Sequence, residues 1–194
     1  MAKNYYKIFP CVAFAGFMSL VISYNHASAA SAATSPAAAL FSQLESFHGH
    51  ICAGSLFGAR IGFAAREALK AAGGTGRFTA RYYDLSCPVD GIQVAAGTTY
   101  GNKALTAQDR DEHRLVLTAE GNKRAVEARL TKKAEELGIK SRDLGKSAKA
   151  LPPNSPERVR LEQEIEEIYT WLRTAPTNEV VIVTTLNNKQ KRGA

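Results

Sequence analysis

Three side chains that bind transition metals lie within five positions of the segment "HGHIC". His48, His50 and Cys52 are each two residues from the next, and side chains at this spacing point to the same side of an extended backbone. Gly49 allows the backbone to bend and close the set. Imidazole and thiolate are usual donors for Zn²⁺ and also bind other transition metals. The segment therefore predicts a metal site, with zinc as first candidate and nickel, iron, copper or haem iron as alternatives.

Cys87 is the candidate fourth donor, if the chain folds back to bring it near. It stands in a predicted turn just before a short helix, and Asp84 and Asp90 flank it as possible oxygen ligands or as partners that orient a ligand. Cys52 also precedes a predicted helix, whose positive end favours a thiolate.

A disulfide between Cys52 and Cys87 is the alternative to metal binding. In an exported protein, two cysteines most simply pair with each other. Closing this loop of about 35 residues would stabilise the fold by roughly 4 kcal/mol on the chain-entropy model. The residues alone leave both alternatives open.

Residues 1–29 have the three parts of a secretory signal peptide. A start with two lysines and no acid precedes an apolar run over 8–23, and Ala27 and Ala29 form a small-x-small cleavage pattern. We expect cleavage after Ala29, or alternatively after Ala32, and a periplasmic or secreted protein. The run is shorter than the roughly 20 residues of a membrane span, so no stable membrane insertion is expected after cleavage.

The charge pattern argues against nucleic acid as a partner. The formal net charge is +7, and loss of Lys3 and Lys7 with the signal peptide would lower it to +5. Lysines and arginines are interspersed with acids, and the one basic cluster, in the tail 189–194, has the character of a frayed solvated terminus. His113 lies in the charged stretch "QDRDEHR", where a solvated side chain is expected.

The pattern of apolar residues predicts a single α+β domain over 36–188, preceded by a flexible leader at 30–35. Its sheet, mixed or antiparallel, is expected to be backed by helices. The expected elements are helices over 36–46, 54–72, 88–96 and 155–174, a charged helical stretch ending near 149, a strand over 77–84, a hairpin over about 113–130, and a strand over 179–186.

The sequence also predicts where the hairpin turns and where the last strand lies in the sheet. The hairpin turns at Gly121 and Asn122, while a helix over 124–137 competes with its second strand. The continuous β-branched run "EVVIVTTL" is typical of a central strand.

Glycines recur four apart in the predicted helix over 54–72. Gly54, Gly58 and Gly62 share one face of it, although glycine inside a helix costs about 1 kcal/mol relative to alanine. We therefore expect another helix or strand to approach this face closely.

Two blocks, "FHGHICAGSLFGARIGFAAREAL" and "CPVDGIQVAAGTTYGNKAL", resemble the FmdE family of formylmethanofuran dehydrogenase components in their motifs, order and separation. They cover about residues 47–105. The resemblance implies an α+β domain and a bound transition metal, usually zinc, at the histidine–cysteine motif. The positions that match the family motif are His48, His50, Cys52, Cys87 and Asp90, with Gln93 and Gly97 in scaffolding roles.

The chain also departs from this family. Ala53 replaces the proline of the C-P-G turn, and Thr98 stands where a further cysteine often occurs. No C-x-x-C pair follows, so the C-terminal zinc ribbon of some members is missing. Together with the predicted signal peptide, these departures argue against transferring the parent enzyme's activity.

The sequence thus supports three hypotheses. The first is an exported FmdE-like protein that binds, senses or hands on a transition metal, with a position that could take a small ligand. The second is an enzyme in which the metal activates a water and Asp90 or Asp84 handles protons. The third is a disulfide-stapled domain without metal. A homodimer is expected from the exposed-looking tyrosines of "RYYD", the glycine face and the resemblance.

Overall fold

The computed structural model of the protein describes residues 35–187. The predicted signal peptide, residues 30–34 of the predicted leader and the basic tail lie outside the described residues. Ser35, the last residue of that leader, is hydrogen-bonded: its Oγ donates to the carbonyl oxygens of Thr174 and Ala175 at 3.2 and 3.0 Å.

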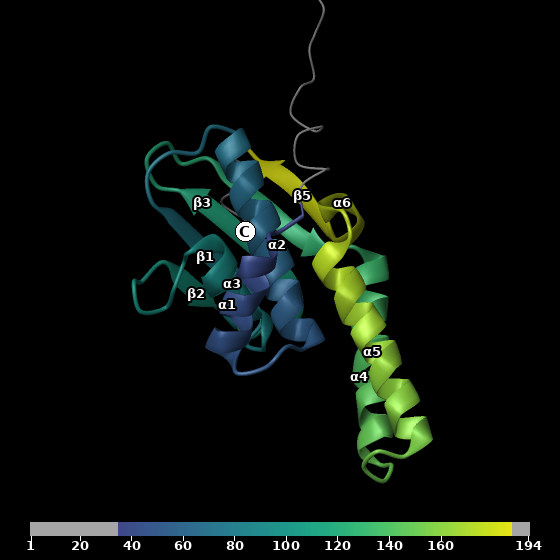
Figure 1. The fold of residues 1–194 in the computed structure, drawn as a ribbon. Helices are drawn as coiled ribbons and strands as arrows, with labels where there is room; N and C mark the ends of the chain where they lie inside the picture. Colours follow the sequence, from purple (N-terminus) through teal and green to yellow (C-terminus); the bar gives the residue numbers. More distant parts are fainter. Residues whose placement is uncertain (1–34, 188–194) are drawn as a thin grey trace, which may run out of the picture.

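Helices and strands alternate irregularly along the chain (Figure 1). They are α1 (Ala38–His48), α2 (Ala53–Ala71), β1 (Phe78–Tyr83), α3 (Pro88–Ala96), β2 (Leu105–Ala107), β3 (Glu112–Ala119), β4 (Ala125–Leu130), α4 (Lys132–Lys149), α5 (Pro156–Thr174), α6 (Thr177–Val180) and β5 (Val181–Leu186).

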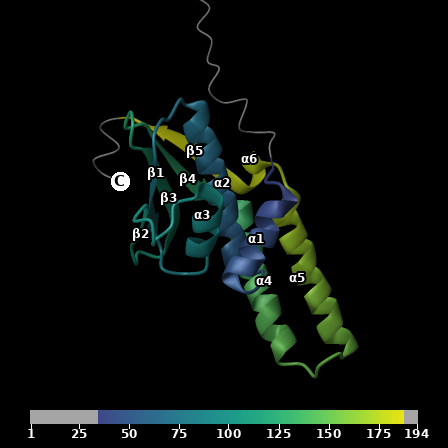
Figure 2. The same cartoon turned by 60° about the vertical axis from the view of Figure 1, so that its left-hand side comes forward.

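The strands form one mixed sheet in the order β2-β1-β3-β4-β5. β1 and β2 are parallel, and the other pairs are antiparallel. α1, α2 and α3 lie together on one side of this sheet, and α4 and α5 form a hairpin that extends away from it (Figures 1 and 2). This architecture confirms the predicted α+β class with a sheet backed by helices.

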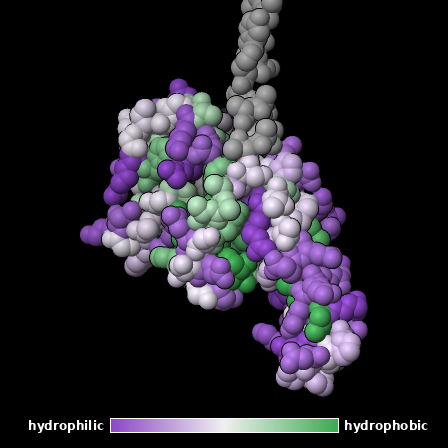
Figure 3. All heavy atoms as spheres, viewed as in Figure 1, coloured by the Kyte–Doolittle hydropathy of each residue, from purple (hydrophilic) through white to green (hydrophobic). Residues whose placement is uncertain are grey.

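The projecting hairpin has a mostly hydrophilic surface in the view of Figure 3. Ion pairs lie along each of its helices, and Lys140 of α4 pairs with Glu164 of α5. Within residues 35–187, every helix is too short or too polar to cross a membrane.

The predicted central position of the last strand is wrong. β5 lies at the edge of the sheet and pairs only with β4, and Ile182 is 56% exposed. Its β-branched residues reflect the preference of such side chains for strands, not burial on both faces. Two short elements, β2 and α6, were not expected from the sequence.

The hairpin of β3 and β4 is confirmed, and the competing helix over 124–137 is wrong in its first half. Strand β4 runs to Leu130, where it pairs with Val181 of β5. Helix α4 begins only after Thr131, whose side chain accepts a hydrogen bond from the backbone N–H of Ala134. The N-cap, rather than the helical periodicity before it, decides where this helix starts.

The glycine face of α2 lies directly against α3, as the glycine spacing predicts. A Cβ atom added to Gly58 would lie 1.9 Å from the carbonyl oxygen of Pro88, and one added to Gly91 of α3 would lie 2.3 Å from the carbonyl oxygen of Ser55. The two helix backbones therefore touch, and neither can carry a side chain at this crossing. A Cβ atom at Gly54 would lie 2.9 Å from Cβ of Cys87, so the contact reaches the start of both helices.

We expect Gly58→Ala to destabilise the protein by about 1–3 kcal/mol, as overpacking does elsewhere. The obstructing atom is backbone, which cannot rotate away, and this outweighs the gain in helix propensity. The measurement is the free energy of unfolding in urea. Gly101→Ala is the matched control, because nothing lies within 4 Å of a Cβ atom there. Equal stability of the two variants would show that the helices can separate at little cost.

Candidate metal centre

The three residues of the His-x-His-x-Cys motif converge on one point. Their ligand atoms all lie within 4.8 Å of one another, and the rings of His48 and His50 are 4.8 Å apart between centroids. His48 ends α1, and Gly49 then turns the chain with a φ of 86°, a left-handed conformation that suits glycine. The convergence thus comes from a helix end and a turn, not from the fully extended segment that we expected.

Cys52 is the N-cap residue of α2. The backbone N–H of Ser55 donates to Cys52 Sγ at 3.3 Å, and the Ser55 hydroxyl lies 3.6 Å from the same sulfur. Nε2 of His48 is 3.8 Å from it. Burial opposes ionisation of the thiol, but the hydrogen bonds from Ser55, His48 and Cys87 outweigh it and lower the pKa of Cys52. The helix start thus favours a thiolate, the form that binds metals.

Cys87 is the N-cap residue of α3, and it lies beside Cys52 because the two helices touch at their N-terminal ends. Both cysteines are free thiols in the structure, and Cys87 is the more exposed. Burial and the neighbouring Cys52 charge raise the pKa of Cys87. Adjacent thiols thus have opposite pKa shifts, and a cation placed between them would favour ionisation of both.

Asp90 orients His48 rather than extending into the donor cluster. Its Oδ2 lies 2.7 Å from His48 Nδ1, and its Oδ1 accepts from Nε2 of Gln93 at 3.2 Å. Gln93 Oε1 in turn accepts from the backbone N–H of Tyr100 at 3.0 Å. A carboxylate at Nδ1 keeps a ring proton on that nitrogen. In the protonated ring Nε2 therefore donates to Cys52 Sγ, and in the neutral ring Nε2 has a lone pair for a metal. This is the usual support of a metal-binding histidine.

The same hydrogen bond affects the proton affinity of the ring. The bond with Asp90 raises the pKa of His48, while partial burial works against it. A metal must displace any proton from Nε2, so its binding weakens as the pH falls through this raised pKa.

Asp84 and His113 lie in a second polar cluster. Asp84 accepts from the backbone N–H of Leu85 at 2.7 Å and from the Ser86 hydroxyl. His113 Nδ1 lies 2.9 Å from the Tyr82 hydroxyl and 3.7 Å from Asp84 Oδ2. The expectation that His113 is solvated therefore holds only in part: its side chain is 33% exposed, but β3 also brings it against the buried Tyr82. Through these hydrogen bonds Asp84 stabilises the turn that precedes Cys87.

Two residues near the cluster were missed in the sequence. Ser55 follows Cys52 by three positions, the spacing of a capping box, and this signal could have identified it. Tyr169 comes from α5, far along the chain, and no local pattern points to it. Burial and the nearby Cys52 charge raise the pKa of Tyr169, whose hydroxyl is within hydrogen-bonding reach of the Ala53 backbone.

A family model matches the part of the chain that contains these residues. The model described as "FmdE, Molybdenum formylmethanofuran dehydrogenase operon" matches residues 47–182. The chain belongs to the FmdE family. The match includes the whole donor cluster, Cys87, Asp90 and nearly all of the sheet, and membership supports a metal-binding role.

A solved structure shares the fold. It is the crystal structure of a tungsten formylmethanofuran dehydrogenase FmdE-like protein from Syntrophus aciditrophicus, with a TM-score of 0.52 and 18% sequence identity over 78% of this chain and 72% of that chain. A comparison with curated proteins found no match.

In the metal-free protein, we expect the two thiols to react with iodoacetamide at different pH. The alkylation rate of Cys52 should reach half its maximum below the ordinary cysteine pKa of about 8.5, and that of Cys87 above it. Mass spectrometry resolves the two sites, with glutathione as the reference thiol. Coincident midpoints, or the reverse order, would contradict the assigned roles of Ser55 and His48.

Asp90→Asn should weaken metal binding by about 10–100-fold, the usual effect of losing a residue that orients a metal ligand. The amide can present its N–H₂ group to His48 and favour the wrong tautomer. Competition with a chromogenic chelator measures the affinity. Asp143→Asn, on the exposed face of α4, is the control and should bind as the wild type does. If Asp90 were itself a ligand, its loss would match that of Cys52→Ser.

Proposed function

We propose that this FmdE-family protein holds a transition metal ion, zinc in the first instance, in an exported compartment. His48, His50 and Cys52 supply three donors, and Cys87 supplies the fourth. The observation that carries the proposal is the convergence of two imidazoles and one thiolate-favouring cysteine within 4.8 Å. Donors of this kind and number suit Zn²⁺, with nickel, iron and copper as chemical alternatives.

Residues outside the donor set support the same role. Asp90 holds His48 in the tautomer that presents Nε2, and Ser55 stabilises the ionised Cys52. His50 is exposed whereas His48 and Cys52 are partly buried, so one side of the cluster faces solvent. A small ligand could reach a metal from that side, which fits a protein that senses a metal or hands it on.

A metal-dependent enzyme is the second candidate. Catalytic zinc sites have three protein donors and an open position, and the exposed side of this cluster would provide one if Cys87 does not bind. A metal there would lower the pKa of a water bound to it and so provide a hydroxide nucleophile. Tyr169, whose hydroxyl lies near the start of α2, is the nearby group that could position such a water or a substrate oxygen.

Export and dimerisation are part of the proposal. The N-terminal pattern supports removal of 29 residues, or alternatively 32. Mass spectrometry of the protein from its native cell tests this, and an intact Met1 would contradict it. Light scattering tests the homodimer, and a monomer mass at micromolar concentration would contradict it.

We expect His50→Ala and Cys52→Ser each to abolish stoichiometric metal binding, whereas His113→Ala leaves it unchanged. The first two remove donor atoms from the cluster, and His113 bonds to Tyr82 in a separate one. Metal content is measured by mass spectrometry of protein purified without chelator. His113→Ala also serves as the control for loss of a partly buried imidazole.

The same variants distinguish metal binding from a disulfide between Cys52 and Cys87. If Cys52 and Cys87 were paired, the wild type would contain no metal and no free thiol, and Cys52→Ser would lose a few kcal/mol of stability. Equal metal content in wild type and Cys52→Ser would end the metal-site proposal.

A further inference from the structure

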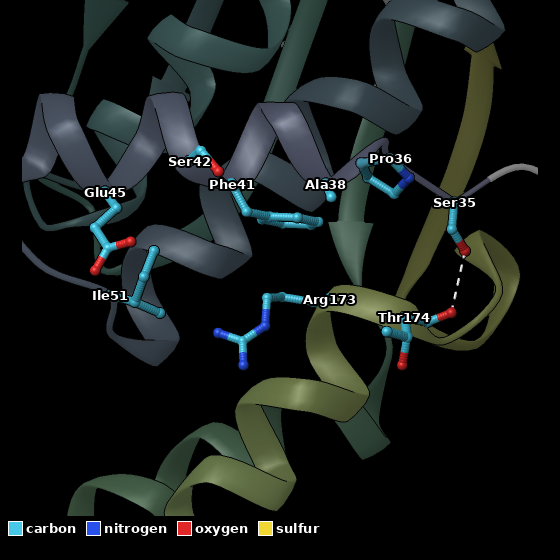
Figure 4. A pocket seen from close by; sticks show the side chains of 9 residues that line it. All are labelled: Ser35, Pro36, Ala38, Phe41, Ser42, Glu45, Ile51, Arg173 and Thr174. Atoms are coloured by element: carbon cyan, nitrogen blue, oxygen red, sulfur yellow. Dashed lines mark hydrogen bonds between the residues drawn. The ribbon is translucent and has the colours of Figure 1, made fainter.

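A pocket of about 520 Å³ lies between α1 and the C-terminal end of α5 (Figure 4). Pockets of roughly 300–1,000 Å³ are typical of small-molecule sites, in which an apolar lining is combined with a few polar groups. The apolar lining here comes from Pro36, Ala38, Phe41 and Ile51. This volume is enough for a molecule the size of an amino acid with a large side chain.

The pocket carries one group of each charge. Glu45 of α1 and Arg173 of α5 extend into it from facing helices (Figure 4). Bonds of Arg173 with other described residues, Glu166 and Thr170, all use Nη2, so Nε and Nη1 are available to a ligand. Across residues 35–187, the Glu45 carboxylate has no hydrogen-bond or ion-pair partner.

The α5 end of the pocket is firmly held. Arg60 of α2, fully buried, donates from Nη1 to the carbonyl oxygen of Arg173 at 3.0 Å and from Nη2 to that of Ala175 at 2.6 Å. Ser35 holds the same turn through the carbonyl oxygens of Thr174 and Ala175. A ligand therefore meets an Arg173 backbone that is already fixed, which lowers the entropic cost of binding.

The pocket is distinct from the metal centre. Ile51 lines it, while the residues on either side, His50 and Cys52, belong to the donor cluster. None of the metal donors lines the pocket, so a ligand there would not displace one.

We propose that this pocket binds a small zwitterion with an apolar body, of the class of apolar amino acids. The carboxylate would accept charge-assisted hydrogen bonds from Nε and Nη1 of Arg173, and the ammonium would face Glu45. The apolar part of the ligand would pack against Phe41 and Ile51. A simple carboxylate would be repelled by Glu45, and a simple amine would leave Nε and Nη1 of Arg173 without an acceptor, since only its Nη2 pairs with Glu166.

Isothermal titration calorimetry with three matched probes tests this proposal. They are L-phenylalanine, 3-phenylpropanoate, which lacks the ammonium, and 2-phenylethylamine, which lacks the carboxylate. Phenylalanine should bind at least about tenfold more tightly than either of the others, because each lacks one charge-assisted interaction. No binding of phenylalanine at millimolar concentration, or equal binding of 3-phenylpropanoate, would overturn the proposal.

Variants locate the binding. Arg173→Gln and Glu45→Gln should each weaken phenylalanine binding at least about tenfold. Arg158→Gln is the matched control, since Arg158 is also on α5 and paired with a glutamate, Glu162, but does not line the pocket. Circular dichroism verifies that each variant folds, and unchanged binding by folded Arg173→Gln would refute the site. Cys52→Ser should bind phenylalanine as the wild type does, so this test is independent of the metal.

Discussion

The contact between the backbones of α2 and α3 is the constraint on which the candidate metal centre depends. Gly58 meets the carbonyl group of Pro88, and Gly91 meets the carbonyl group of Ser55, so the helices cross too closely for a side chain at either position. Both helices begin with a cysteine as N-cap, and this crossing brings the two N-caps together. The same placement of α3 sets Asp90 against His48 at the end of α1. Without the glycines, Cys87 and Asp90 would be held away from the segment that carries His48, His50 and Cys52.

Local electrostatics then gives neighbouring groups in the candidate site different protonation states. The start of α2 and the Ser55 hydrogen bonds favour a thiolate at Cys52, whereas the neighbouring Cys87 keeps its proton more strongly. Asp90 determines which nitrogen of His48 is available, and Gln93 holds Asp90 while its other end binds the backbone at Tyr100. The result is a set of donors oriented before any ion arrives, which reduces the cost of assembling a site.

The sequence reveals those parts of the site that depend on local spacing. The H-x-H-x-C motif, the glycine spacing of α2 and the N-cap position of both cysteines are all short-range signals, and the structure places them together. The features that were missed depend on long-range pairing: the edge position of β5, the contact of His113 with Tyr82, and the approach of Tyr169 from α5. Strand propensity does not encode which neighbour a strand pairs with, and a charged segment does not show which side chain turns inward.

X-ray absorption at the K-edge of the metal in the zinc-loaded protein tests the central claim most directly, because it counts donor atoms by type. The account predicts two sulfur donors at about 2.3 Å and two imidazole nitrogens at about 2.0–2.1 Å. Cys87→Ser should then lose one sulfur and retain the nitrogens, since His48 and His50 lie on the other segment. A spectrum described by oxygen and nitrogen donors alone, without sulfur, would contradict a metal centre built on Cys52.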